Sequence, residues 1–120
     1  MKRILLPVAL ALLCTGAYAD MLYAVDGDVL YGVSPEDGGY AALSDTWSGT
    51  YLLTSCDGYL YAIQGDVLYM ADPYDGSWTG LTETWDGSHS ITASSRSIYV
   101  AHGDAVYLAD PDDGAWLAIP

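Results

Sequence analysis

A 38-residue repeat constrains the fold of this chain more than any other feature of its sequence. Three segments align without a gap, and they begin at Leu22, Leu60 and Ile98. They read LYAVDGDVLYGVSPEDGGYAALSDTW, LYAIQGDVLYMADPYDGSWTGLTETW and IYVAHGDAVYLADPDDGAWLAIP. Self-similarity at a fixed period in this range is typical of solenoids and β-propellers, in which each unit buries its apolar surface against its neighbours.

Two kinds of turn divide each repeat into short segments. A Gly-Asp pair is typical of a type II′ hairpin, because glycine takes the positive φ needed at the first turn position. A Pro-x-Asp-Gly turn follows, in which Pro presets φ for a type I turn and Gly supplies the left-handed residue after it. The Gly-Asp pairs are residues 27–28, 65–66 and 103–104, and the second turns are residues 35–38, 73–76 and 111–114.

The runs between these turns predict four strands in each repeat. In the middle unit they are Thr50–Cys56, Leu60–Ile63, Val67–Met70 and Ser77–Leu81. In the last unit the first strand is Ser88–Ser94. No window outside the N-terminal segment shows sustained helical periodicity. We therefore predict an all-β fold built from four-stranded antiparallel blades of the β-propeller type, in about three repeats. A β-solenoid or an open meander is the alternative.

The first 19 residues have the three-part layout of a secretory signal peptide. Two basic residues precede an apolar run from Ile4 to Cys14, and Ala17-Tyr18-Ala19 offers small residues where a signal peptidase cleaves. The run is too short to span a membrane, which requires about 20 residues. We predict a signal over residues 1–19 and a repeat domain over residues 20–120 that is secreted or periplasmic. A retained anchor or a lipid on Cys14 is the alternative.

The repeat domain is strongly acidic. The chain carries a formal net charge of −13, and loss of Lys2 and Arg3 with the signal would make it −15 (−13 − 2), leaving Arg96 as the remaining basic residue. This charge disfavours nucleic acid and anionic membrane surfaces as partners. The acidic residues are spread through the turns, which indicates solubility or a saline habitat, with attraction of basic partners as the alternative. With 52% hydrophobic residues the domain is not expected to be disordered.

The repeats predict an incomplete propeller. The first unit begins just before Leu22 and lacks an opening strand, so residues 20–120 supply about eleven strands, whereas closed propellers have about four to eight blades. Leu12–Ala19 can take the place of the missing strand if the signal is retained. Completion is expected from self-association into a homo-oligomer or from another propeller segment, because bare strand edges favour aggregation. An arc that stays open against a different partner is the alternative.

The second turn and its surroundings resemble the kelch family of β-propellers, including the galactose-oxidase-like branch. The shared motif is Asp-Pro-x-x-Gly-x-Trp after a Tyr-containing strand, here Asp72–Trp78 and Asp110–Trp116, with the weaker form Ser34–Tyr40 in the first unit. The repeats differ from kelch repeats in two ways. They have Gly-Asp where kelch repeats have a glycine pair, and they are shorter than a kelch repeat, which has about 50 residues. The resemblance implies a propeller fold with short, divergent blades. PQQ-type and tachylectin-like blades are the alternative relatives.

Two sets of turn residues differ between repeats and are the candidate ligand-binding positions. Binding residues lie preferentially on loops carried by a rigid scaffold. The residues before the Gly-Asp turns are Asp26, Gln64 and His102, and the residues after the turn prolines are Glu36, Tyr74 and Asp112. A ligand bound at one mouth of the propeller is expected to contact these positions. Free variation of solvent-exposed turn residues is the alternative.

Calcium is the metal that the acidic turns suggest. Asp oxygens from flexible loops suit its six to eight ligand positions. The candidate ligands are Asp26, Asp28, Asp110, Asp112 and Asp113. No loop has the spacing of an EF-hand or of a glycine-rich nonapeptide repeat. Because Asp is also an ordinary turn residue, we predict no metal site and no cofactor, with calcium-stabilised turns as the alternative.

The tryptophans recur at repeat spacing, which predicts packing between blades. They are Trp47, Trp78, Trp85 and Trp116. Stacking of an exposed aromatic ring on a sugar is the alternative, and it applies most to Tyr74, which lies in a turn. Cys56 is the remaining cysteine once the signal is removed and is predicted to be a buried, inert thiol, with an intermolecular disulfide as the alternative.

These observations favour a non-catalytic function. His89, His102 and Cys56 lie on different repeats in no recognisable ligand pattern, so no copper site carries over from galactose-oxidase-like enzymes. No nucleophile elbow is present either. We predict an exported β-propeller module that binds a protein or a glycan and is completed by self-association. The alternatives are a fragment of a larger kelch-like enzyme or surface protein, and a calcium-stabilised structural repeat.

Overall fold

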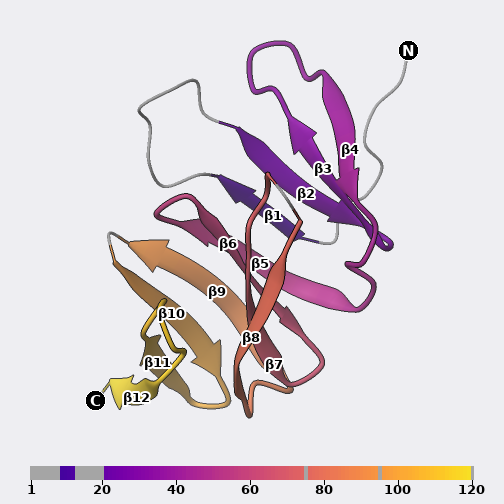
Figure 1. Cartoon of the computed structure of the whole chain (residues 1–120). Helices are drawn as coiled ribbons and strands as arrows, with labels where there is room; N and C mark the ends of the chain where they lie inside the picture. The colour runs from indigo at the N-terminus through magenta and orange to yellow at the C-terminus, as the bar shows by residue number, and fades with distance from the viewer. Residues whose placement is uncertain (1–8, 13–20, 75, 95, 120) are drawn as a thin grey trace.

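The computed structural model describes residues 9–12, 21–74, 76–94 and 96–119, and within them all regular structure is β-strand. Three antiparallel four-stranded sheets follow one another along the chain, one for each repeat (Figure 1). Blade 1 consists of β1 (Ala9–Leu12), β2 (Leu22–Asp26), β3 (Val29–Val33) and β4 (Tyr40–Ser44). Blade 2 consists of β5 (Thr50–Cys56), β6 (Tyr59–Gln64), β7 (Val67–Ala71) and β8 (Trp78–Glu83). Blade 3 consists of β9 (Ser88–Ser94), β10 (Ser97–His102), β11 (Ala105–Ala109) and β12 (Trp116–Ile119).

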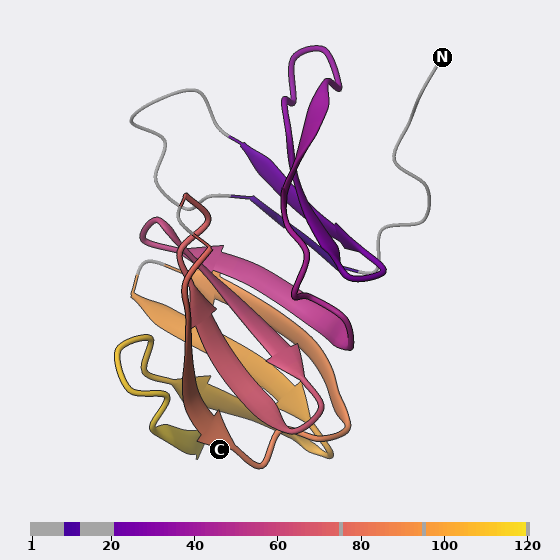
Figure 2. The same cartoon turned by 45° about the vertical axis from the view of Figure 1, so that its right-hand side comes forward.

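The prediction of an all-β fold with four-stranded blades is confirmed. The blades stack through their opening strands, because β1 contacts β5 and β5 contacts β9, while β4, β8 and β12 are the outer strands. Together they form an open arc rather than a closed ring (Figure 2). No helix in the described ranges is long and apolar enough to cross a membrane. We call the face of a blade that is turned towards the next blade in sequence its front, and the opposite face its back.

The opening strand of blade 1 comes from the N-terminal apolar run. β1 pairs antiparallel with β2, from Ala9 opposite Val25 to Leu12 opposite Leu22. The sequence suggested Leu12–Ala19 for this place, and the strand in the full chain lies earlier, within the apolar run itself. The rest of the predicted signal, including its cleavage site and Cys14, lies outside the described residues. Cleavage after residue 19 stays a prediction, and it would remove β1.

Glycines in the left-handed conformation close the predicted turns. Gly27, Gly65 and Gly103 have φ of 67°, 57° and 60°, while the aspartate after each has an ordinary φ, as a type II′ hairpin requires. The glycine of each second turn also has a positive φ, and its amide donates to the carbonyl four residues before it. The Asp57-Gly58 hairpin, which the sequence analysis did not single out, has positive φ at both residues, typical of type I′.

Each interface between blades has its own apolar core. The core between blades 1 and 2 contains Tyr23, Val25, Leu30, Trp47, Leu53, Leu60, Ala62 and Ala71. The core between blades 2 and 3 contains Cys56, Tyr61, Ile63, Leu68, Trp85, Ile98, Val100 and Ala109. Trp47 and Trp85 are 1% and 2% exposed, which confirms their predicted packing between blades. Cys56 is fully buried, as predicted.

Tyr61 joins blade 2 to the second turn of blade 3. Its side chain is buried, and its hydroxyl donates a hydrogen bond to the carbonyl of Pro111 at 3.0 Å. Burial is the main reason that the pKa of the Tyr61 hydroxyl lies well above its usual value of 10.0, and neighbouring Cys56 and Asp112 raise it further. Burial likewise raises the pKa of Tyr23 and of Tyr51.

The free energy of unfolding is therefore expected to fall above about pH 10. Below that pH the tyrosines are protonated in both states, whereas above it the unfolded chain loses protons that the folded chain retains. Urea unfolding between about pH 8 and pH 11 measures the fall. Tyr61→Phe should make the fall shallower, while costing about 1 kcal/mol at neutral pH through the lost hydrogen bond. An equal fall for the variant and the wild type would contradict this account.

Candidate functional site: an aromatic pocket between blades 2 and 3

The structure separates the two sets of residues that the sequence predicted to bind a ligand. Because neighbouring strands are antiparallel, the Gly-Asp hairpins lie at one end of the blades and the Pro-x-Asp-Gly turns at the other. Asp26, Gln64 and His102 lie at the first end, and Glu36, Tyr74 and Asp112 lie at the second. A five-residue strand is about 17 Å long, so one mouth does not bring the two sets together.

The interface between blades 1 and 2 shows how the first end is filled when the blades are closed. Trp78 lies against Trp47, with ring centroids 4.1 Å apart. The indole N–H of Trp78 donates to Thr46 Oγ1 at 2.8 Å, and that of Trp47 donates to Ser44 Oγ at 2.7 Å. Both indole groups have partners within the protein, and the two rings fill the space between the blades.

The same repeat positions form an open pocket between blades 2 and 3. The ring centroids of Trp85 and Trp116 are 6.0 Å apart, and Trp116 is 45% exposed. The space beside them is a pocket of about 200 Å³. Its lining residues are Thr84, Trp85, His102, Tyr107 and Trp116. The predicted packing between blades thus holds for Trp85, whereas Trp116 has one side free.

One difference between the repeats lies at a position that the sequence analysis singled out. At the closed interface the Gln64 amide donates to Thr50 Oγ1 on the neighbouring strand at 2.9 Å and to the Thr46 carbonyl in the connection between blades 1 and 2 at 3.4 Å. His102 stands at the same position one repeat later and lies 3.0 Å from Ser88 Oγ through Nδ1. The imidazole makes one of the two contacts of the glutamine, and the connection between blades 2 and 3 is held instead by the Asp66 carbonyl, which accepts from the Thr84 and Trp85 amides.

That connection also has a different backbone conformation. Thr84 has φ of 111°, whereas its counterpart Thr46 has an ordinary φ. Thr46 holds the indole of Trp78 in the closed interface. No described residue accepts a hydrogen bond from the indole of Trp116 in the open one. The loss of this hydrogen bond accompanies the opening of the pocket.

Trp85 is the rigid wall of the pocket. Its carbonyl accepts a hydrogen bond from Ser88 Oγ at 2.7 Å and lies 2.9 Å from the Tyr51 hydroxyl. Its indole N–H donates to Thr82 Oγ1 at 2.9 Å. With the Ser88 hydroxyl proton on the carbonyl, Ser88 Oγ can accept from His102 Nδ1 when the imidazole carries its proton there. In that tautomer His102 Nε2 is available as a hydrogen-bond acceptor.

The pocket combines flat apolar surfaces with polar atoms that have no partner. Tyr107 stands nearly perpendicular to both Trp85 and Trp116, at interplanar angles of 85° and 88°. Within the described part of the chain, the Trp116 indole N–H, His102 Nε2 and the Tyr107 hydroxyl make no hydrogen bond. Such a pocket can stack one face of a ring-shaped ligand and exchange hydrogen bonds with polar groups at its edge.

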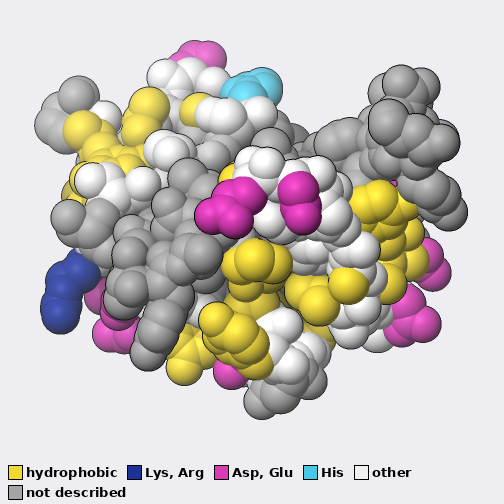
Figure 3. Space-filling model, turned by 90° about the horizontal axis from the view of Figure 1, so that it is seen from above, with side chains coloured by type: hydrophobic (Ala, Val, Ile, Leu, Met, Phe, Trp, Pro, Cys, Tyr) yellow, Lys and Arg dark blue, Asp and Glu magenta, His cyan; other side chains and the backbone are white. Residues whose placement is uncertain are grey.

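The turn carboxylates stabilise the backbone of the turns. Asp37 accepts from the Gly39 amide at 2.8 Å, and this hydrogen bond is the main reason that the pKa of Asp37 is lowered. Asp72, Asp110 and Asp113 each accept from the amide two residues later. On the face seen in Figure 3 the acidic side chains lie in separate groups among hydrophobic ones. Among the described residues, no group of three or more His, Cys, Asp or Glu is arranged to hold a metal ion.

No protein-family model and no curated protein matches this sequence. Solved structures nevertheless resemble its fold. Hydrazine synthase of Kuenenia stuttgartiensis superimposes with a TM-score of 0.63 and 12% identity, over 98% of this chain and 36% of that one. The hemopexin-fold protein CP4 from cow pea gives 0.57 and 11%, over 92% and 65%. PorZ, a surface component of the type-IX secretion system of Porphyromonas gingivalis, gives 0.54 and 15%, over 83% and 14%.

These three proteins have β-propeller-type folds, and this chain shares that fold. The chain spans less than two thirds of the length of each of them. At identities of 11% to 15% the likeness concerns the fold alone. The function therefore has to be argued from the residues of the pocket.

Proposed function

We propose that this chain is a non-catalytic β-propeller module, exported from the cytoplasm, that binds a carbohydrate in the pocket between Trp85 and Trp116. The observation that carries the proposal is the meeting of aromatic faces and unpartnered polar atoms in a pocket of about 200 Å³. Pockets for drug-sized ligands begin at about 300 Å³, so this one suits a single sugar ring.

The apolar face and the polar edge of a sugar ring match different walls of the pocket. One face of a pyranose presents C–H groups, which pack on an aromatic ring, and Trp116 offers such a ring. The hydroxyl groups at the edge of the sugar can accept from the Trp116 indole N–H and donate to His102 Nε2. Trp85 is already held in place by its hydrogen bonds, so little conformational entropy is lost when a ligand binds.

A carbohydrate is a better candidate for this pocket than the other ligands considered. A protein partner typically buries about 800 Å² on each side, more than a pocket of five residues provides. Calcium needs several oxygen ligands, and the carboxylates of the turns already accept hydrogen bonds from the backbone.

Export and family are further parts of the proposal. The signal-peptide layout of residues 1–19 supports a secreted or periplasmic location. The Asp-Pro-x-x-Gly-x-Trp turns at Asp72–Trp78 and Asp110–Trp116 support a distant kelch-like relationship. A chain that forms part of a larger kelch-like surface protein would place the same pocket on that protein.

Trp116→Ala is expected to weaken saccharide binding at least tenfold, which corresponds to about 1.4 kcal/mol. The substitution removes the exposed stacking face and one hydrogen-bond donor. The wild type and the variant are compared by calorimetric titration with the methyl glycosides of glucose, galactose, mannose and N-acetylglucosamine. Tyr74→Ala is the control, because Tyr74 is 84% exposed and lies at the opposite end of the blades.

The control variant should bind as the wild type does. Failure of the wild type to bind any glycoside, or equal binding by the Trp116→Ala variant, would refute the proposed function. His102→Gln adds a second check, since it removes the Nε2 acceptor and restores the residue found at the closed interface. It is expected to weaken binding as well.

A further inference from the structure

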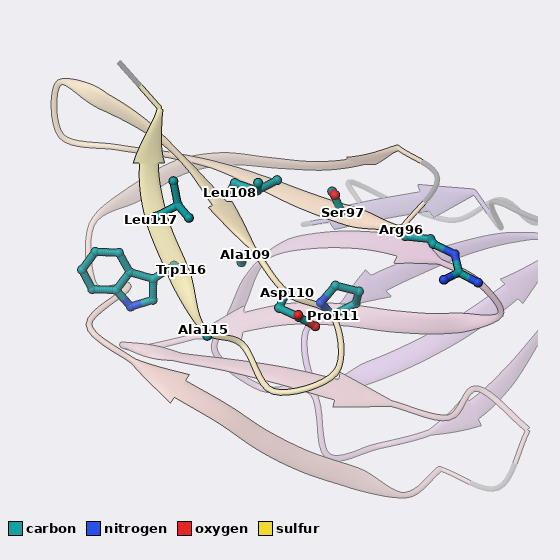
Figure 4. A pocket seen from close by; sticks show the side chains of 9 residues that line it. All are labelled: Arg96, Ser97, Leu108, Ala109, Asp110, Pro111, Ala115, Trp116 and Leu117. Carbon is teal, nitrogen blue, oxygen red and sulfur yellow. The ribbon is translucent and has the colours of Figure 1, made fainter.

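The front of blade 3 is an exposed apolar sheet face. It presents Tyr99, Val106, Leu108, Leu117 and Ile119, which alternate with the residues that contact blade 2. Val106, Leu117 and Ile119 are 44%, 60% and 39% exposed. Figure 4 shows Leu108 and Leu117 on one side of the sheet and the ring of Trp116 on the other. This face is therefore distinct from the aromatic pocket.

In the other two blades the central strands of the same face are buried under the next blade, while Ala41 and Thr79, the outer-strand counterparts of Leu117, are exposed. The counterparts of Tyr99 are Tyr23 and Tyr61, which are 2% and 3% exposed. The counterparts of Val106 are Leu30 and Leu68, which are 1% and 0% exposed. Two interfaces in the same molecule thus show what covers a blade front, and in both cases it is the back of another blade.

The back of blade 1 is the complementary surface. Tyr23 and Val25 on its front are buried against blade 2, so Leu22, Tyr31, Val33 and Tyr40 lie on the opposite face. Tyr31 and Tyr40 form a perpendicular ring pair at 5.6 Å. The pairs Tyr69–Trp78 and Tyr107–Trp116, on the backs of blades 2 and 3, have the same geometry at 5.2 Å. Blade 1 therefore has the back that the repeat uses at an interface.

The Pro-x-Asp-Gly turns also correspond between the existing interfaces and the pairing of blade 3 with blade 1. At the interface of blades 2 and 3, the turn carbonyl of Pro111 accepts from Tyr61 on the blade below. Pro35 occupies the corresponding place in blade 1, and Tyr99 occupies the place of Tyr61 in blade 3. A turn with the geometry of residues 34–38 can therefore sit over Tyr99 as the turn of blade 3 sits over Tyr61.

Charge also favours this pairing. A hollow of about 290 Å³ beside the front of blade 3 is lined by Leu108, Leu117 and Arg96, and Asp110 and Trp116 also lie on its wall (Figure 4). Arg96 is the one basic residue of positions 20–120, and its counterpart in blade 2 is Gly58. The turn of blade 1 that would enter this hollow carries Glu36 next to Pro35.

We propose that the front of blade 3 docks on the back of blade 1 of a second copy of this chain, with Arg96 facing Glu36 of the second copy. Two such junctions join two arcs of three blades into a ring of about six, within the range of about four to eight blades found in closed propellers. The junction uses the front of blade 3 and the carbohydrate pocket its back, and sedimentation and sugar titration test the two proposals independently.

Sedimentation equilibrium of the full chain tests the docking. The wild type should sediment as a dimer of 12.8 kDa chains. Val106→Asp should shift it to monomer, because its counterparts Leu30 and Leu68 are buried under the next blade, so a carboxylate would be buried at the junction. Thr79→Asp is the control, because Thr79 lies on the front of blade 2 and stays exposed beside blade 3. It should leave the dimer intact.

A charge exchange identifies the partner surface. Arg96→Glu should weaken association at least tenfold, and adding Glu36→Arg to the same chain should restore it, because the two charges are then opposite again across the junction. A wild type that stays monomeric, or a dimer that survives Val106→Asp, would overturn the proposal. So would a double variant that associates no better than Arg96→Glu alone.

Discussion

Trp85→Ala is expected to lower the free energy of unfolding by about 3–5 kcal/mol, the usual cost of removing a buried aromatic side chain. Trp85 is 2% exposed and belongs to the core between blades 2 and 3. The substitution leaves a cavity at that interface and deprives Thr82 Oγ1 of its indole donor. Domains of ordinary stability unfold at a cost of about 5–15 kcal/mol, so the variant should be close to unfolding. Urea unfolding followed by circular dichroism measures the loss.

Trp116→Ala is the matched comparison for that experiment. Trp116 occupies a neighbouring position on the same pocket but is 45% exposed, so its removal should cost about 1 kcal/mol or less. The two variants therefore separate stability from binding, since Trp116→Ala should fold and yet bind sugar poorly. Equal losses of stability for the two substitutions would mean that the Trp116 ring is packed as tightly as the Trp85 ring.

Gly114→Ala is expected to cost about 3 kcal/mol, made up of backbone strain and a steric clash. Gly114 has φ of +76°, and a Cβ there would lie 2.7 Å from Leu81 Cβ and 2.8 Å from Thr82 Oγ1. The turn of blade 3 cannot move away freely, because Thr82 Oγ1 donates to the Gly114 carbonyl at 3.0 Å. Thermal unfolding of the variant measures the cost.

Gly38→Ala isolates the backbone contribution. Gly38 has φ of +75°, and a Cβ there would meet nothing within 4 Å, so this variant should lose about 1 kcal/mol from strain alone. Gly76 is intermediate, because a Cβ there would lie 3.8 Å from Ser44 Cβ. The account predicts that Gly114→Ala costs more than Gly38→Ala by the clash. If the three glycines cost the same, the close contact between the turn of blade 3 and blade 2 does not exist.

The fold could be predicted from the sequence because the same pattern of strands and turns occurs in each of the three repeats. Thr50–Cys56 and Ser88–Ser94 are strands with the predicted bounds. Each predicted turn contains the positive-φ glycine that its type requires. These features depend on neighbours in sequence, where glycine and proline have strong and specific preferences. The pairing of Ala9–Leu12 with β2 was not predicted at its observed position, because it depends on a contact distant in sequence.

The candidate site could be predicted only in part. Comparison of repeats selected the position of Gln64 and His102, which does differ between the closed and the open interface. The recurrence of Trp78 and Trp116 predicted equal packing for both, yet they pack differently. The difference depends on the backbone of Thr84 and on hydrogen bonds between blades, which the residue types alone do not specify. The alternating direction of the strands would have shown that the two turn sets lie at opposite ends.

The indole signals of the four tryptophans provide the most direct test of the carbohydrate pocket. A two-dimensional ¹H–¹⁵N spectrum resolves each indole N–H, and single Trp→Phe variants assign them. Titration with the four methyl glycosides should shift the signals of Trp116 and Trp85 for at least one sugar and leave those of Trp47 and Trp78 in place. If no glycoside moves the Trp116 signal, or if all four signals move together, the pocket between blades 2 and 3 is not a sugar-binding site.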